Sequence, residues 1–284
     1  ISANDYDLDV TVQDRFERLN LPPELYASQP GQNRPLLAVD YTGQAPNPPN
    51  LGEASVRTGN VSPLLFPLGD IDFQDSGPPA QLNRLFAGSI SGGNRIVILD
   101  PDTGQVFQEI QLVGAPTFTL PGSATVTAVE FQPGTGTFFA AMTFGGANST
   151  LATINLTNGE VTPLGGAFNN TGIGPVGGLA FDPTDPTNLT LLGVTESGVS
   201  SGLLVRFNLD PTDAIPDGRA TSVGPTGFTD VAGLEFHPLT GVLYASLGAN
   251  ENVNAPGKPG DLVIIDRTNP TFGQAGSGTI VVGT

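Results

Sequence analysis

Three stretches of the sequence repeat one pattern: VTAVEFQP at residues 126–133, VGGLAFDP at 176–183 and VAGLEFHP at 231–238. They begin 50 and 55 residues apart and align without gaps. Each has apolar residues at its first, fourth and sixth positions, ends in proline, and is followed by a Thr- or Gly-containing turn and a second apolar run. Apolar alternation that is broken by such a turn predicts a β-hairpin.

Two further strands recur after these hairpins. The third strand ends in a polar turn, as in RIVILDPDTG at 95–104, LATINLTNG at 151–159, LLVRFNLD at 203–210 and DLVIID at 261–266. A fourth strand follows, as in VFQEIQLV at 106–113 and EVTPL at 160–164. Four short strands therefore recur every 45 to 55 residues, in five units near 35–75, 80–116, 124–168, 174–226 and 230–284.

Four-stranded units at this period are typical of propeller blades, because a small twisted sheet cannot bury both faces alone and packs radially on its neighbours. We therefore predict an all-β protein, a β-propeller of about five (or six) four-stranded blades at residues 35–284. Residues 1–34 are predicted to form an irregular N-terminal arm with one strand and a short helix. A β-sandwich pair and a β-solenoid are the alternatives; solenoid repeats are usually shorter, and a sandwich has no reason to repeat its turn chemistry.

Three strings carry a resemblance to a known family: RIVILDPDTGQV at 95–106, VAGLEFHPLTGVLYAS at 231–246 and LVIIDRTNP at 262–270. They resemble secreted bacterial propeller repeats, of the kind that includes the YVTN-type surface-layer repeats. The resemblance covers about residues 82–284; the tetrapeptide that names those repeats does not occur, and the first unit departs furthest. It implies cell-surface or extracellular display and a binding or structural role.

The composition excludes several kinds of chemistry. The 284 residues carry 27 acidic and 10 basic side chains, for a net charge of -17, with no cysteine and one histidine. Disulfides, thiolate nucleophiles, Cys-ligated zinc and His-pair metal sites are therefore excluded. The acidity argues against nucleic acid and anionic lipid as partners, and no apolar run reaches the roughly 18 residues of a membrane helix. The partners that we expect are other proteins, copies of the same chain, or neutral glycans.

Two features of the sequence favour export. The chain begins at Ile1 rather than Met, and we expect that a leader or upstream region has been removed. Five Asn-x-Ser/Thr sequons offer glycosylation sites, at Asn60, Asn148, Asn155, Asn169 and Asn188. We therefore predict an extracellular or cell-surface location.

Acidic residues supply the candidate sites. Asp70, Asp72 and Asp75 place three carboxylates within six residues, an oxygen-only set that suits Ca²⁺; a solvated acidic turn is the alternative. Glu130 and Glu235 occupy the same place in their repeats, which fits either the polar face of a strand or a ring of acids around a channel. Calcium is the one cofactor that this pattern suggests. The lone His237 is predicted to be a surface or turn residue.

The N-terminal arm contains a strand-like segment with alternating side chains, made of Asp7, Leu8, Asp9, Val10, Thr11 and Val12. The first unit lacks an opening strand in this reading, and propellers usually close by pairing their two ends. Residues 7–12 are expected either to close the ring of their own chain or to add to an edge of the next copy.

No catalytic motif stands out, and we predict no catalytic residue. The leading hypothesis is a non-enzymatic, exported structural or interaction module that assembles into a filament or layer. A propeller glycoside hydrolase or polysaccharide lyase that uses a carboxylate pair is the second hypothesis. A cation-dependent binder of glycan or another ligand is the third.

Overall fold

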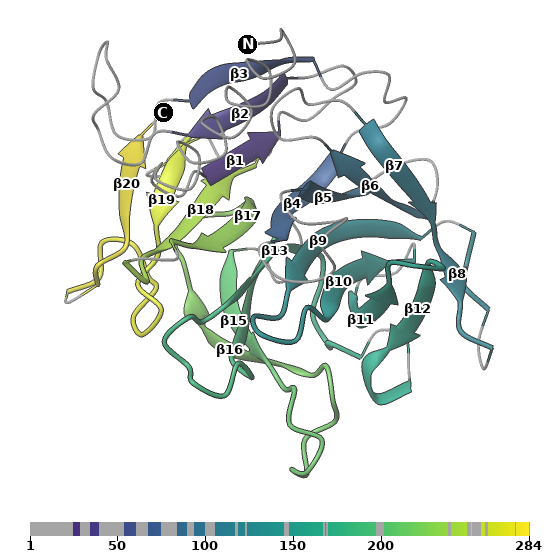
Figure 1. The fold of residues 1–284 in the computed structure, drawn as a ribbon. Helices are drawn as coiled ribbons and strands as arrows, with labels where there is room; N and C mark the ends of the chain where they lie inside the picture. Colours follow the sequence, from purple (N-terminus) through teal and green to yellow (C-terminus); the bar gives the residue numbers. More distant parts are fainter. Residues whose placement is uncertain are drawn as a thin grey trace, which may run out of the picture.

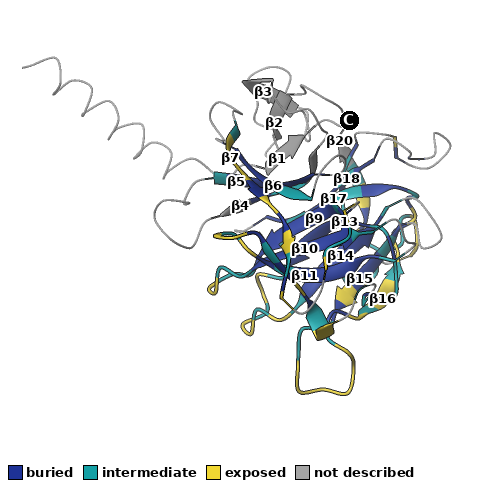
Figure 2. Ribbon diagram, turned by 90° about the vertical axis from the view of Figure 1, so that its right-hand side faces the viewer, coloured by how far each residue is buried: buried dark blue, intermediate teal, exposed yellow. Residues whose placement is uncertain are grey.

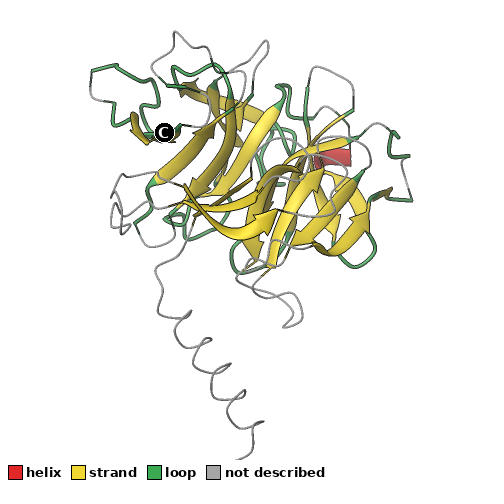
Figure 3. Cartoon of the chain, turned by 90° about the horizontal axis from the view of Figure 1, so that it is seen from above, coloured by secondary structure: helices red, strands yellow, loops and turns green. Residues whose placement is uncertain are grey.

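The computed structural model describes residues 25–28, 35–39 and 54–60 and, with short gaps, residues 68–283. They form five sheets around a common axis (Figure 1). The strands, grouped by sheet, are β1 (Leu25–Ser28), β2 (Pro35–Val39) and β3 (Ala54–Asn60); β4 (Leu68–Gln74), β5 (Arg84–Ser89), β6 (Arg95–Leu99) and β7 (Val106–Gln111); β8 (Val113–Gly114), β9 (Thr125–Phe131), β10 (Phe138–Thr143), β11 (Thr150–Asn155) and β12 (Glu160–Pro163); β13 (Val176–Phe181), β14 (Leu191–Thr195), β15 (Leu203–Phe207) and β16 (Ala220–Pro225); β17 (Val231–Phe236), β18 (Leu243–Leu247), β19 (Leu262–Ile264) and β20 (Ile280–Gly283). The described part holds one turn of 3-10 helix, Leu164–Gly166, and no helix long and apolar enough to cross a membrane (Figure 3).

The sheets are arranged as a β-propeller, as the repeats predicted. Four of them hold four consecutive antiparallel strands, ordered outward from the axis as β4–β7, β9–β12, β13–β16 and β17–β20. Their first strands lie side by side around the axis, with β9 between β4 and β13, and β17 beside β13. The short strand β8 adds to the outer edge of β12 in parallel. The predicted hairpins are confirmed, since Phe131 pairs with Phe138 and Phe181 with Leu191.

The structure describes four such blades and the three-stranded sheet β1–β3, whereas the sequence predicted five or six blades of four strands. The difference arises near the N-terminus. Residues 35–75 were assigned to one unit, but β4 belongs to the blade that ends with β7. Residues 25–28 were assigned to the arm, but β1 pairs with β2. Residues 7–12 lie outside the described part of the chain.

The core lies between neighbouring blades. Phe131 of β9 packs edge-on against Phe86 of the preceding blade, with ring centroids 4.9 Å apart. Ala128 faces the other way and packs in a second cluster with Phe181 of the following blade. Because successive strand residues point to opposite faces, one inner strand serves two interfaces. Figure 2 shows the result, with β9, β13 and β14 buried and part of β16 exposed.

An Asp-x-Thr turn recurs in the loops at one end of the blades. In each turn the Asp Oδ1 accepts the backbone N–H and the hydroxyl proton of the Thr two residues later, at 2.9 Å and 2.6–2.7 Å; the four acids are Asp182, Asp185, Asp210 and Asp266. The Thr268 bonds hold the pKa of Asp266 at about 2. These bonds satisfy loop donors that no strand can serve.

Candidate functional site: an axial carboxylate cluster

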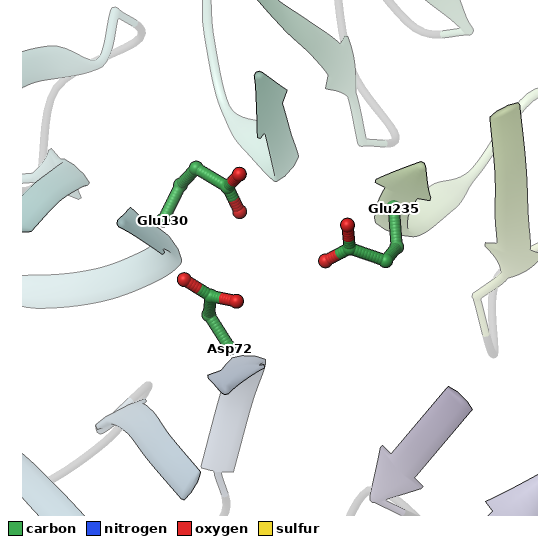
Figure 4. A group of neighbouring side chains, drawn as sticks. All are labelled: Asp72, Glu130 and Glu235. Carbon is green, nitrogen blue, oxygen red and sulfur yellow. The ribbon is translucent and has the colours of Figure 1, made fainter. Parts of the chain in front are cut away.

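The repeated pattern places acidic side chains at the axis. Asp72, Glu130 and Glu235 each directly precede a phenylalanine on an inner strand, β4, β9 and β17 respectively. Because the inner strands converge, the three carboxylates meet, and each offers an oxygen within 4.8 Å of the others. Figure 4 shows the three side chains directed toward one shared space. The fourth inner strand, β13, has Ala180 at this position.

Backbone N–H groups hold these carboxylates in place. The edge of an inner strand that faces the axis has no further strand to pair with, so its N–H groups need other acceptors. Asp72 Oδ2 accepts the N–H of Phe131 on the next blade at 2.6 Å, and Glu130 Oε1 accepts that of Phe181 at 3.0 Å. Ala180 of β13 has no side-chain acceptor, so it cannot accept the N–H of the next blade in the same way. Accordingly, the Phe236 N–H is accepted by the Oε1 of its own neighbour Glu235, at 2.8 Å.

Burial gives the cluster unusual electrostatics. Asp72 is 9% exposed and Glu130 6%, whereas Glu235 is half-buried. Burial raises the pKa of Glu130 well above its usual range, and the charges of Asp72 and Glu235 raise it further, against the opposing Phe181 hydrogen bond. The second oxygen of Glu130, Oε2, is buried and has no hydrogen-bond partner among the described residues. One of the two oxygens of this deeply buried carboxylate therefore has no hydrogen-bond donor among the described residues.

Asp70, two residues before Asp72 on β4, also lies at the axis. Its Oδ2 accepts the N–H of Leu179 on β13 at 3.4 Å, and burial, followed by the charge of Asp72, raises its pKa well above the usual range. The corresponding residues of the other inner strands are small: Ala128, Gly178 and Gly233. A Cβ added at Gly233 would lie 3.6 Å from Asp70 Oδ1. The Asp70 side chain therefore extends across the axis into space that the small residues leave open.

The predicted calcium set is divided between two levels of the axis. Asp72 joins Glu130 and Glu235, Asp70 bonds to β13, and Asp75 lies outside the described residues. Of the two readings given for Glu130 and Glu235, the ring of acids describes their position. Their partnership with Asp72 was missed, although LGDIDF at 68–73 aligns with VTAVEF at 126–131 and shares its acid-Phe ending.

A second carboxylate pair lies at the other end of the blades. Glu196 follows Thr195, which pairs with Val176 at the start of β13. Burial raises the pKa of Glu196 to about 7, and the charge of Asp230 adds to the effect. A Cβ at Gly177 would lie 2.5 Å from Glu196 Cγ, so the Cγ methylene of Glu196 lies close to the glycine backbone.

The remaining predicted residues lie apart from the axis. His237 is in a turn, as expected, but it is buried rather than on the surface; its Nδ1 accepts the Thr240 N–H at 3.1 Å, and burial lowers its pKa.

Among the sequons, Asn155 is exposed at the end of β11 and Asn148 is half-buried. Asn188 has φ +53° and donates its Nδ2 to Pro133 O at 3.2 Å. The side chains of Asn60 and Asn169 lie outside the described residues.

No protein-family model matches the sequence, and no curated protein matches it. Solved structures do resemble the fold. They include a chain of the "Crystal Structure of Mitotic Checkpoint Complex" (13% identity, 75% of this chain and 55% of that chain, TM-score 0.41), the "Structure of U3-55K" (10%, 78% and 53%, 0.41) and a chain of the "Crystal structure of Nidogen/Laminin Complex" (14%, 86% and 71%, 0.47). The protein spans about half the length of the first two chains. At these identities and scores the likeness carries no argument about function.

Proposed function

We propose that the chain is a non-enzymatic interaction module, exported to the cell surface or the extracellular space, that contacts other proteins through the outer strands of its blades. The position of its large exposed apolar side chains carries this proposal. Of the six among the described residues, four lie on outermost strands: Phe107 on β7, Val113 on β8, Val223 on β16 and Ile280 on β20. Among the described strands, β7, β16 and β20 pair on one side only, and such an edge can template the addition of another strand.

The burial of the axial carboxylates supports binding over hydrolysis. A glycosidase needs two carboxyl groups that flank a sugar ring in contact with both. At the axis, Asp72 and Glu130 are buried and each already accepts a backbone N–H. These acids therefore serve the ring of inner strands rather than a substrate.

The sheet β1–β3 is, in this proposal, a fifth blade for which the structure describes three strands and not the outermost one. β1 contacts β4 beside the axis, in the manner of an inner strand, and each of the other four blades has four consecutive antiparallel strands, to one of which β8 is added. A strand added at β3 would complete the blade. Residues 7–12 supply it in our proposal, either within the chain or from a neighbouring copy, which gives a head-to-tail assembly.

The net charge of -17 makes the partner distinguishable by salt. Copies of this chain repel one another at low ionic strength, so screening strengthens self-assembly. A basic protein partner is attracted instead, and its binding weakens as salt rises. A second copy of the chain is the partner to test first, because it requires no other component.

Size-exclusion chromatography with light scattering, run across a salt series, tests the proposal. We expect larger species as salt and protein concentration rise, and a loss of these species in Phe107→Ser and Ile280→Ser. Leu189→Ser is the matched control, since Leu189 is an exposed apolar residue on a hairpin loop. Removal of residues 1–20, which leaves β1 in place, tests strand exchange. A chain that stays monomeric at every salt concentration contradicts self-assembly, and glycan turnover that Glu235→Gln abolishes contradicts a non-enzymatic role.

A further inference from the structure

One buried oxygen atom at the axis has no hydrogen-bond partner in the described part of the chain. Glu130 is 94% enclosed, its Oε1 accepts the Phe181 N–H, and its Oε2 makes no hydrogen bond with any described residue. Figure 4 shows the Glu130 carboxylate directed into the space that Asp72 and Glu235 border. A buried carboxylate is costly unless a positive group or hydrogen-bond donors compensate its charge. The geometry therefore calls for something electropositive in that space.

The donor atoms define the kind of ligand. All three groups are carboxylates, which prefer hard cations such as Ca²⁺ and Mg²⁺ to zinc or copper. Oxygens on opposite sides of a Ca²⁺ ion lie roughly 4.6–5.2 Å apart, since each Ca–O distance is about 2.3–2.6 Å. The three oxygens lie within 4.8 Å of one another, which fits around one such ion. We infer that Asp72, Glu130 and Glu235 bind a single divalent cation at the axis, with Ca²⁺ the best fit.

The carboxylates are held in position for this role. One oxygen of each accepts a backbone N–H, from Phe131, Phe181 or Phe236. The Phe181 bond orients the Glu130 carboxylate, so that its Oε2 can serve as a ligand without further ordering. Ca²⁺ takes six to eight oxygens. The cation therefore keeps water on the positions that these three oxygens do not fill, on the side of half-buried Glu235.

The cation joins parts of the chain that are distant in sequence. Its ligands come from β4, β9 and β17, which belong to three different blades. Asp70 fills the axis on one side, because its carboxylate reaches the Leu179 N–H on β13. Removal of the cation leaves like charges facing one another across the ring, so occupancy stabilises the closed arrangement of inner strands. This role is independent of the outer-strand contacts proposed above.

Calcium titration of the full chain, after treatment with EDTA, tests the inference. Isothermal titration calorimetry is expected to give one site per chain, and the melting temperature is expected to rise with the logarithm of the Ca²⁺ concentration. Glu130→Gln keeps an acceptor for the Phe181 N–H but removes the charge. Its affinity for Ca²⁺ falls by more than about 100-fold, beyond the usual loss for outer-shell changes. Glu109→Gln, an exposed carboxylate that pairs with Arg95, is the control and binds as the wild type.

The metal-free state gives a second readout. In EDTA, Glu130→Gln is expected to melt at or above the wild-type temperature, because a neutral amide replaces the buried charge. In Ca²⁺ the wild type is expected to melt at the higher temperature. Failure to bind Ca²⁺ or Mg²⁺, or wild-type affinity in Glu130→Gln, overturns the inference. A melting temperature that follows pH but not Ca²⁺ also overturns it, since a shared proton then neutralises the cluster. Should Glu130→Gln not fold, Glu235→Gln provides the same comparison at a half-buried ligand.

Discussion

Glu196 offers a direct test of the electrostatics of this propeller. Burial, with a smaller contribution from the charge of Asp230, raises its pKa from 4.5 to about 7. The folded protein therefore holds this proton more tightly than the unfolded chain does. Between the two pKa values the folded state binds more protons, so the free energy of unfolding falls as pH rises and levels off above about 7. A shift of about 2.5 units corresponds to about 3 kcal/mol, at about 1.4 kcal/mol per unit.

Glu196→Gln removes this dependence, since an amide is neutral throughout the range. We expect urea unfolding at pH 4.5 and pH 8 to show that the wild type loses about 3 kcal/mol more than the variant does. Glu109→Gln, at an exposed carboxylate, serves as the control and keeps the wild-type slope. Parallel stability profiles for the wild type and Glu196→Gln would refute the argument, because they would mean that Glu196 titrates alike in the folded and unfolded chains.

Two further predictions concern packing. Gly202→Ala is expected to destabilise the fold by more than about 2 kcal/mol in urea unfolding, because φ is +65° and the new Cβ would lie 1.7 Å from Phe228 O. Gly273 has a similar φ of +73°, but a Cβ added there would have no atom within 4 Å, so Gly273→Ala is expected to lower the free energy of unfolding by only about 1 kcal/mol. Equal losses of stability in the two variants would contradict a steric cause. Phe86→Ala opens a cavity between two blades. It is expected to lower the free energy of unfolding by about 3–5 kcal/mol, measured in the same assay. A loss below about 1 kcal/mol would show that the interface repacks.

The repeats could be predicted from sequence because local signals define them. Apolar alternation, the Phe-x-Pro ending and the turn residues all lie within some 15 residues, and the hairpins follow from them. Asp70 and Asp72 were predicted to belong to a calcium set or to a solvated acidic turn, and the sequence did not indicate that they lie on an inner strand. The structure explains the position of Asp72: its carboxylate lies at the axis and accepts the N–H of Phe131, which is 59 residues later in the sequence. The alignment of LGDIDF with VTAVEF relates Asp72 to Glu130, but it does not indicate that Asp72 accepts the Phe131 N–H.

The same limit applies to the candidate site. The alignment of the repeats placed Glu130 and Glu235 at equivalent positions, and a propeller brings equivalent positions together at its axis. The sequence could not show that Glu130 Oε2 has no hydrogen-bond partner among the residues that the structure describes, because that depends on the depth of burial. His237 shows the converse case. A polar residue in a turn is expected at the surface, yet the Thr240 N–H satisfies its Nδ1 and the surrounding blade encloses it.

The Glu130 carboxylate can have two roles at once because it has two oxygens. One role is fixed by the fold, since inner strands expose N–H groups toward the axis and an acid on the preceding blade accepts them. If that were the whole explanation, an asparagine or glutamine would serve as well, without the cost of a buried charge. The chain instead has carboxylates at three of these positions, each with an oxygen within 4.8 Å of the others, and Glu130 Oε2 is buried without a hydrogen-bond partner among the described residues. The charge, rather than the acceptor, is therefore the property that needs an explanation, and a cation at the axis supplies it.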